Sequence, residues 1–216
     1  MSGQNVSEER AGKILITGFD PFGGQSINPA WEAVKALPDS IGGIPLHKVR
    51  VPTVFGRCAE VLENAAASLE AAPLMILMVG QAGGRACVTP EMTALNIRFA
   101  AIPDNEGNMP RGTAVLEDEE NALFCPLPLI EITDKLKAEG LPVSVSFHAG
   151  TFVCNDLYYA ALHKYGKEGI PCCFIHVPFV PEQAEEKVPS LPLPVIVNTL
   201  ERLIGAFLKA MNHKET

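Results

Sequence analysis

Three residues of this chain have side chains suited to nucleophilic catalysis, and each follows or ends an apolar run. Cys154 lies in GTFVCNDLYYA, His176 in CCFIHVPF and Glu91 in VTPE. A thiol can act as a nucleophile, an imidazole as a base, and a carboxylate can orient that base. The three residue types therefore predict thiol-based acyl transfer, provided that the fold brings them together.

Cys154 is expected to lie at the start of a helix, because the amphipathic stretch DLYYAALHKYG follows it. Unpaired amide groups and the helix dipole stabilise a thiolate there, which predicts a pKa lowered from about 8.5 towards neutrality. The same amides could hold an oxyanion. Cys172 and Cys173 fall inside a predicted strand and Cys58 on an apolar helix face, so we expect these three thiols to be inert.

Each candidate also has a purely structural interpretation. Most free cysteines are small buried residues, which would suffice for Cys154. His176 could be a hydrogen-bonded core histidine, and Glu91 a loop carboxylate. Position in the sequence leaves both interpretations open.

The six cysteines include no CxxC pair and no zinc-ligand spacing, so we expect free thiols and no zinc site. A metal site formed by His148, Cys154 and His176 is the alternative, although these residues lack a ligand-spacing signature.

Apolar runs alternate with amphipathic helical stretches along the chain, and several runs are apolar throughout, as in buried parallel strands. This pattern predicts a single-domain three-layer α/β/α sandwich with a mixed, mostly parallel central sheet over residues 13–216. Residues 1–12 are polar and are expected to form a flexible extension. The expected strands are 13–17, 46–52, 74–79, 93–101, 143–147 and 172–177, and the expected helices are 28–37, 56–72, 130–140, 154–167 and 194–211.

Ligands of open α/β sheets bind beyond the carboxyl ends of the strands. The loops at those ends are GFDPFGG, GQAGGRACVTPE, SFHAGTFVCN and HVPFVPEQ, so we expect Glu91, Cys154 and His176 at one rim of the sheet. GFDPFGG lacks the spacing of a phosphate loop and contains two phenylalanines beside an aspartate. Such a loop is better suited to walling a small, flat, neutral ligand.

The overall composition argues against two classes of partner. A net charge of −8 without a cluster of Lys and Arg disfavours nucleic-acid binding. No apolar run approaches the roughly 20 residues of a membrane span, and the N-terminal stretch lacks the apolar core of a signal peptide. We therefore expect a cytoplasmic protein that binds neither nucleic acid nor membrane.

The motifs KILITGFDPFGG, INPAWEAV, VGQAGGR, TPE, IPDNEG, AGTFVCN and IHVPFVPEQ occur in this order between residues 13 and 183. In this combination the chain resembles pyroglutamyl peptidase I. The resemblance implies a cofactor-free cysteine exopeptidase that removes an N-terminal pyroglutamyl residue from peptides, commonly as a homotetramer.

The resemblance also implies roles for single residues. Cys154 would be the nucleophile, His176 the base and Glu91 its orienting acid. The substrate pocket would be formed by Phe19, Phe22, Asn28, Gln81, Phe152 and Val153.

The chain departs from the family pattern at Ala101 and Met92, where members often carry arginine. Arg98 is three residues from Ala101, so a regular strand would point the two side chains to opposite faces. We therefore expect the pH–rate profile to be displaced from that of arginine-bearing relatives. Two rival functions remain: a different thiol amidase on the same scaffold, and a pyroglutamate-binding relative with little or no turnover.

Overall fold

The sheet at the centre of the molecule positions every candidate residue. The computed structural model describes residues 12–212, so most of the predicted extension, residues 1–11, lies outside the described residues. The sheet has six strands in the order β2-β3-β1-β4-β10-β5. β3, β1, β4 and β10 run parallel, whereas β2 and β5 are antiparallel edge strands. The strands of this sheet are β1 (Ile14–Phe19), β2 (Ser40–Ile41), β3 (Ile44–Val51), β4 (Met75–Gln81), β5 (Thr89–Pro90) and β10 (Cys172–Val177).

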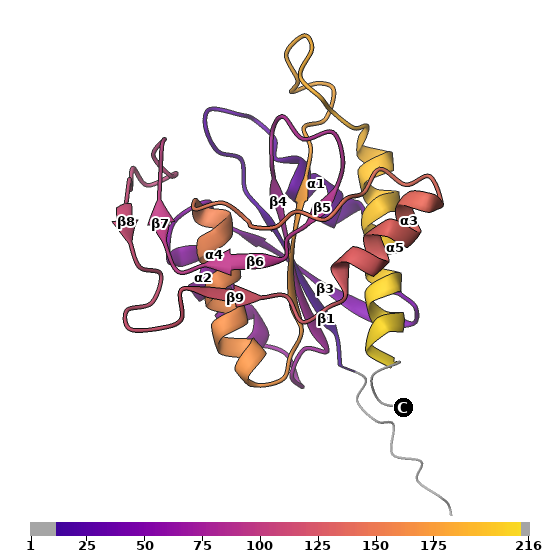
Figure 1. Ribbon diagram of the computed structural model, residues 1–216, viewed down its shortest axis with the longest axis horizontal. Coiled ribbons are helices and arrows are strands. Elements are labelled where there is room, and N and C mark those ends of the chain that lie inside the picture. The colour runs from indigo at the N-terminus through magenta and orange to yellow at the C-terminus, as the bar shows by residue number, and fades with distance from the viewer. Residues whose placement is uncertain (1–11, 213–216) are drawn as a thin grey trace, which may run out of the picture.

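Helices cover both faces of the sheet, and Figure 1 views the sheet nearly edge-on between them. On one face α1, α3 and α5 bury apolar side chains against alternate residues of β1, β4 and β10. On the other face α2 and α4 pack against the intervening residues of the same strands. The α-helices in the described chain are α1 (Pro29–Ala36), α2 (Arg57–Ala67), α3 (Leu129–Ala138), α4 (Val153–Ala161) and α5 (Leu193–Asn212). The predicted three-layer sandwich with a mixed, mostly parallel sheet is therefore confirmed.

Local signals in the sequence mark several element ends correctly. Asn28 caps α1 by accepting a hydrogen bond from the Ala30 amide at 3.0 Å, and Pro29 is the first helical residue. Gly140 follows α3 with φ of 87°, the left-handed conformation that glycine adopts readily after a helix.

The prediction of one strand over residues 93–101 is wrong. The segment forms two short strands, β6 (Thr93–Leu95) and β7 (Arg98–Phe99), which pair with β9 (Ala122–Phe124) and β8 (Arg111–Thr113) in two separate small sheets. Between β6 and β7, the side-chain amides of Asn96 and Asn155 form hydrogen bonds with the backbone in place of a neighbouring strand. Asn96 accepts from the amides of Val115 and Leu116, and Asn155 bonds both the N–H and the C=O of Leu95.

The predicted strand over residues 143–147 is also wrong. This segment is extended beside residues 88–92 but makes only isolated bridges there, so it adds no strand to the central sheet. The helix predicted over 56–72 needs a new end, because α2 ends at Ala67. The helix predicted over 154–167 keeps its extent, but after Ala161 it continues as a π-helical turn, η1 (Leu162–Gly166).

No helix within residues 12–212 is both long enough and apolar enough to cross a membrane.

Candidate active site

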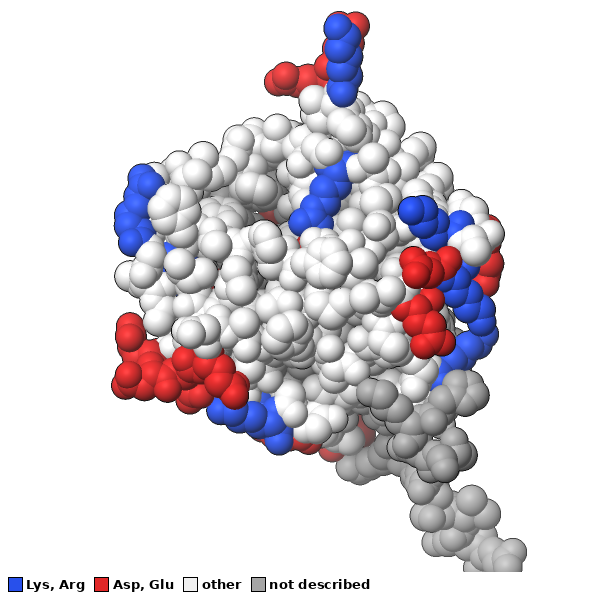
Figure 2. All heavy atoms as spheres, viewed as in Figure 1, with Lys and Arg blue, Asp and Glu red and all other residues white. Residues whose placement is uncertain are grey.

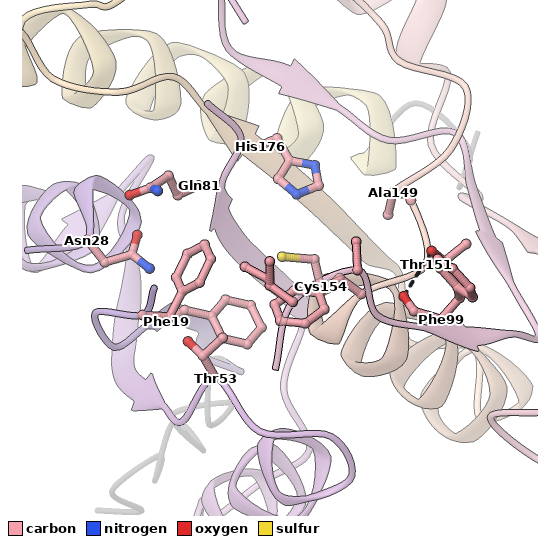
Figure 3. Close-up of a pocket in the computed structure, with 14 residues that line it drawn as sticks. Phe19, Asn28, Thr53, Gln81, Phe99, Ala149, Thr151, Cys154 and His176 are labelled. Carbon is pink, nitrogen blue, oxygen red and sulfur yellow. Dashed lines mark hydrogen bonds between the residues drawn. The ribbon is translucent and has the colours of Figure 1, made fainter. Parts of the chain in front are cut away.

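The start of α4 meets the carboxyl end of β10 on the face covered by α2 and α4. Cys154 is the second residue of α4, and His176 is the penultimate residue of β10. His176 pairs in register with Gly80 of β4, and a Cβ placed on Gly80 would lie 3.0 Å from the Cys154 Sγ atom. The sulfur therefore lies over Gly80, and Figure 3 shows the Cys154 and His176 side chains at the same cavity.

Glu91 contacts the Nδ1 atom of the His176 imidazole. Its Oε1 atom lies 2.6 Å from His176 Nδ1, and its side chain is completely buried. Glu91 follows β5, and β5 pairs Thr89 with His176, so the edge strand fixes the carboxylate at this place. A carboxylate on Nδ1 favours the tautomer that carries its proton there, which leaves Nε2 free to accept one.

Arg85 also contacts this group, and the sequence reasoning missed it. Its Nη1 atom donates to Glu91 Oε1 at 2.6 Å and also to the Thr89 hydroxyl. The same carboxylate oxygen therefore bridges the guanidinium and the imidazole. Arg85 ends the GQAGGR motif quoted above, and that motif was the available signal.

The pKa values of this group depend on burial and on its few charges. Burial lowers the pKa of His176 below its ordinary value, and Arg85 adds to this while Glu91 opposes it. Burial acts to raise the pKa of Glu91, but the hydrogen bond from His176 and nearby positive charge outweigh it and hold that pKa below the ordinary value. The carboxylate is thus ionised and the imidazole neutral at pH 7.

The expectation of a lowered pKa for Cys154 is wrong. Burial is the main cause and the Glu91 carboxylate the second, and together they raise the pKa of the thiol to about 12 against smaller opposing effects of Arg85 and the local amide. Desolvation and a like charge outweigh the helix start. The resting pair is consequently a neutral thiol beside a neutral imidazole.

A cavity of about 420 Å³ opens at Cys154 and His176. The Phe152 ring meets Phe22 at 6.1 Å and Phe55 edge-on at 5.4 Å between centroids, which builds a rigid aromatic wall. Among the described residues, no Lys, Arg, Asp or Glu lines this cavity. The residues that line it are Phe19, Phe22, Asn28, Thr53, Gln81, Phe99, Ala101, Ile102, Ala149, Gly150, Thr151, Phe152, Cys154 and His176.

Two amide side chains close one end of this cavity. Asn28 donates to the Asp20 carbonyl at 2.9 Å, which ties the GFDPFGG loop to α1. Gln81 accepts from the Gln183 amide at 3.3 Å, so its own amide N–H groups remain available to a ligand. Both side chains lie on the Phe19 side of the Cys154 sulfur in Figure 3.

Of the predicted pocket residues, only Val153 does not line the cavity. Its side chain is fully buried in the core between α4 and the sheet, so it can contribute no more than its backbone. No side chain caps the start of α4 at Phe152. The first amides of this helix are therefore oriented as potential donors to a developing oxyanion.

The metal-site alternative finds no matching cluster. Nowhere in residues 12–212 do three His, Cys, Asp or Glu side chains come together as a potential metal site. The His148 ring accepts a hydrogen bond from the Gly150 amide and is not among the cavity-lining residues.

Comparison with known proteins agrees with this geometry. The family model described as pyroglutamyl peptidase matches residues 12–210. A pyrrolidone-carboxylate peptidase of Thermosipho africanus is 46% identical over 204 residues, which cover 93% of this chain and 98% of that protein. The crystal structure of Bacillus amyloliquefaciens pyroglutamyl peptidase I is 42% identical with a TM-score of 0.84, covering 92% of this chain and 97% of that one. Pyrrolidone carboxyl peptidase from Thermococcus litoralis is 31% identical with a TM-score of 0.88, over 94% and 96% of the two chains. The chain belongs to the pyroglutamyl peptidase family.

Proposed function

We propose that this protein is a cysteine exopeptidase that hydrolyses the bond after an N-terminal pyroglutamyl residue, with Cys154 as nucleophile, His176 as base and Glu91 as the acid that orients it. The observation that carries the proposal is the arrangement of Cys154, His176 and Glu91. The Cys154 sulfur and the His176 ring share one cavity, and Glu91 bonds the far nitrogen of the ring at 2.6 Å.

The walls of the cavity are suited to a pyroglutamyl ring. The lactam is small, flat and uncharged, so it needs apolar walls and a few hydrogen bonds rather than an ionic partner. Phe19, Phe22 and Phe152 supply the walls, and Gln81 supplies a donor for the lactam carbonyl. A free N-terminal amino group would enter the same place with its charge unpaired, which is costly in an apolar site.

The acylation step begins from a neutral thiol. As the Cys154 sulfur attacks the pyroglutamyl carbonyl, its proton passes to His176 Nε2, and the resulting imidazolium is stabilised by Glu91. The carbonyl oxygen gains negative charge that the amides at the start of α4 can stabilise. The imidazolium then protonates the departing amine as the C–N bond breaks, which leaves a pyroglutamyl thioester on Cys154.

Deacylation repeats the proton transfers with water. His176 takes a proton from water as the oxygen attacks the thioester carbonyl, and it returns that proton to the Cys154 sulfur as the C–S bond breaks. Pyroglutamate leaves and the neutral pair is restored.

The test is hydrolysis of a pyroglutamyl aminocoumarin amide beside the prolyl analogue, which lacks the lactam carbonyl. We expect turnover of the first and none of the second. We expect Cys154→Ala and His176→Ala to abolish turnover, and Glu91→Gln to leave a measurable rate. Equal rates on both amides would favour a general thiol amidase, and tight lactam binding without turnover would favour a binding relative.

We also propose a cytoplasmic homotetramer, in line with the family resemblance. Phe124 and Phe147 support self-association, because about two thirds of each large apolar side chain is exposed in the single chain. Sedimentation equilibrium would give the mass of the assembly, and a monomer at micromolar concentration would contradict this proposal.

A further inference from the structure

Asp156 is a buried charged residue that the catalytic steps above do not use. It is the fourth residue of α4, two residues after Cys154, and its side chain is 1% exposed. The Arg98 Nε atom donates to Asp156 Oδ1 at 2.6 Å, and the Gly56 amide donates to Oδ2 at 2.7 Å. The Cys58 thiol also donates to Oδ2, at 3.8 Å. Among the described residues, Arg98 is the only cation that contacts this carboxylate.

The ion pair lies within the molecule rather than on its surface. Figure 2 shows an uncharged surface over β6 and β9, and hydrogen bonds from Asn155 hold the start of α4 against β6. Taking two charges out of water is costly, so a buried ion pair is weak evidence for a gain in stability. Its hydrogen bonds are directional, however, and they fix the positions of the groups that they join.

Residues 95–99 run along the start of α4 and contact it on both sides of the nucleophile. Before the nucleophile, the last amide of this segment donates to the Thr151 carbonyl at 2.9 Å. After the nucleophile, Asn155 bonds three backbone groups of the segment, and Asp156 bonds the Arg98 side chain. The Arg98–Asp156 pair is the one contact in this set that joins two side chains.

These contacts replace the usual capping of a helix start. No side chain caps α4 at Phe152, and both Asn155 and Asp156 bond to other segments rather than to amides of their own helix. The first amides of α4 therefore stay available to an oxyanion. Helix ends without caps tend to fray, so contacts from outside must keep these amides and Cys154 in place.

We propose that Asp156 and Arg98 are positioning residues of this enzyme: their buried ion pair holds the first turn of α4 against β7 and thereby fixes the Cys154 sulfur and the oxyanion-binding amides. The inference rests on the proposed function. Neither residue lines the cavity, so both act through the helix and not on the substrate.

The two partners differ in burial, and this difference predicts unequal effects of replacing them. The Arg98 side chain is 28% exposed and can turn to water when Asp156 is neutral. The Asp156 carboxylate cannot reach water when Arg98 is replaced, so its charge stays buried without a cationic partner. Arg98→Met should therefore displace the start of α4 more than Asp156→Asn. Adding Asp156→Asn to Arg98→Met should restore activity, because the neutral amide leaves no unpaired charge.

The test measures kcat and KM with the pyroglutamyl aminocoumarin amide, per folded enzyme as given by the amplitude of urea unfolding. We expect Arg98→Met to lower kcat about tenfold or more, because small displacements of catalytic groups have effects of this size. KM should change by less than about twofold, since Phe19 and Gln81 lie on other elements. Asp156→Asn should lower kcat by about threefold, and the double variant should regain at least about threefold over Arg98→Met.

Lys164→Met is the matched control. It removes an exposed ion pair with Glu63 that joins η1 to α2, beyond the far end of α4 from the nucleophile. We expect its kcat to equal that of the wild type. Arg98→Lys keeps the charge but not the planar head, and its kcat should lie between those of the wild type and Arg98→Met.

Alkylation by iodoacetamide gives a second readout that needs no turnover. Peptide mapping yields the rate at Cys154 relative to Cys87, the other thiol that is only partly buried. A displaced sulfur receives less help from His176, so this ratio should fall several-fold in Arg98→Met and recover in the double variant.

An unchanged kcat and an unchanged alkylation ratio in Arg98→Met would overturn the inference. A double variant no better than Arg98→Met, or an equal loss in Lys164→Met, would also overturn it. If Arg98→Met does not fold, Asp156→Asn decides in its place, and wild-type values of both quantities would refute the role of the pair. Absence of turnover in the wild type would count against the proposed function, while the alkylation ratio would still decide whether the pair positions Cys154.

Discussion

Arg85, Glu91 and His176 form a line of alternating charge and hydrogen bonds that decides the protonation state of the imidazole. The carboxylate accepts from both neighbours through one oxygen, at 2.6 Å each. The Glu91 carboxylate favours the protonated imidazole and so raises the pKa of His176. The positive charge of Arg85 on the same carboxylate partly cancels this effect. Burial then keeps the pKa of His176 below its ordinary value of 6.5. The base is therefore ready to accept a proton at neutral pH.

The pH dependence of kcat/KM follows from these pKa directions. His176 must be neutral to accept the thiol proton, so activity should rise with pH through a pKa below 6.5. The pKa of Cys154 is about 12, so we expect a level profile from pH 7 to 10 with a pyroglutamyl amide. A reactive thiolate–imidazolium pair would instead lose activity in that alkaline range as the imidazolium loses its proton. An alkaline decline with a midpoint near pH 8.5 would thus contradict the neutral pair.

Replacing Arg85 tests whether its charge lowers the pKa of His176. Arg85 lowers the pKa of His176, so Arg85→Met should allow that pKa to rise and move the acidic limb of kcat/KM to higher pH. We also expect kcat to fall roughly tenfold or more, because Glu91 loses a partner that orients it. The matched control is Arg202→Met on α5, which removes an exposed ion pair with Glu139 at the end of α3. An unchanged limb in Arg85→Met would show that the arginine only stabilises the loop.

Sequence reasoning at this scale identified residue types but not their electrostatics. Glu91, Cys154 and His176 could be named because a thiol, an imidazole and a carboxylate each border a predicted element. The pKa of Cys154 could not be foreseen, because it depends on burial and on the nearby Glu91, which come from distant parts of the chain. The helix start was recognised correctly, but its effect is the smaller one.

Gly80 of β4 lies in close contact with Phe174 of β10 and Cys154 of α4. A Cβ at this position would lie 2.7 Å from the Phe174 ring and 3.0 Å from the Cys154 sulfur, distances that force one of them to move. β4 thus lets α4 and β10 converge only because it carries glycine opposite His176. The geometry of the nucleophile depends on a residue with no side chain.

Gly80→Ala should therefore reduce kcat/KM by about tenfold to a hundredfold, because displacements of about 1 Å in catalytic groups have effects of this size. Steady-state kinetics and urea unfolding on one preparation separate this loss from loss of folded protein. Gly205→Ala on α5 is the control, since a Cβ there would contact nothing within 4 Å. It should keep full activity and stabilise the fold by roughly 0.5–1 kcal/mol. Full activity in Gly80→Ala would refute the account of this contact.

The elements that sequence reasoning located best are those with local signals. α1 has its Asn28 cap, and β10 is a continuous apolar run that matches its predicted bounds. The segments around residues 93–101 and 143–147 were misassigned because side chains and segments far away in the sequence satisfy their backbone groups. Asn155, for example, bonds backbone at Leu95 and Ile97. No periodicity within residues 93–101 could reveal that partner.

The whole molecule is organised around one sheet whose strands contribute to two cores. Ile14 and Ile16 point to the face of α1, α3 and α5, and Leu15 points to the face of α2 and α4. Neither core can persist without the strands that the other requires. We therefore propose that residues 13–216 form one cooperative domain, as the sequence predicts.

Trp31 provides a direct probe of this cooperativity. It is the only tryptophan and packs against the core of α1, α3 and α5, whereas the active site lies on the opposite face. We expect Trp31 fluorescence, far-UV circular dichroism and loss of activity to give one urea midpoint. A site that is lost at clearly lower urea than the fluorescence signal would indicate two separately unfolding units.

The central claim is that Cys154 carries the pyroglutamyl group during turnover. The most direct measurement is a rapid acid quench of the enzyme with an activated pyroglutamyl aryl ester, followed by mass spectrometry of its peptides. Fast acylation by such an ester lets the thioester accumulate. The account predicts one added pyroglutamyl group on the peptide that contains Cys154, and no adduct in Cys154→Ala. A pyroglutamyl group on another residue, or continued turnover of pyroglutamyl amides by Cys154→Ala, would contradict it.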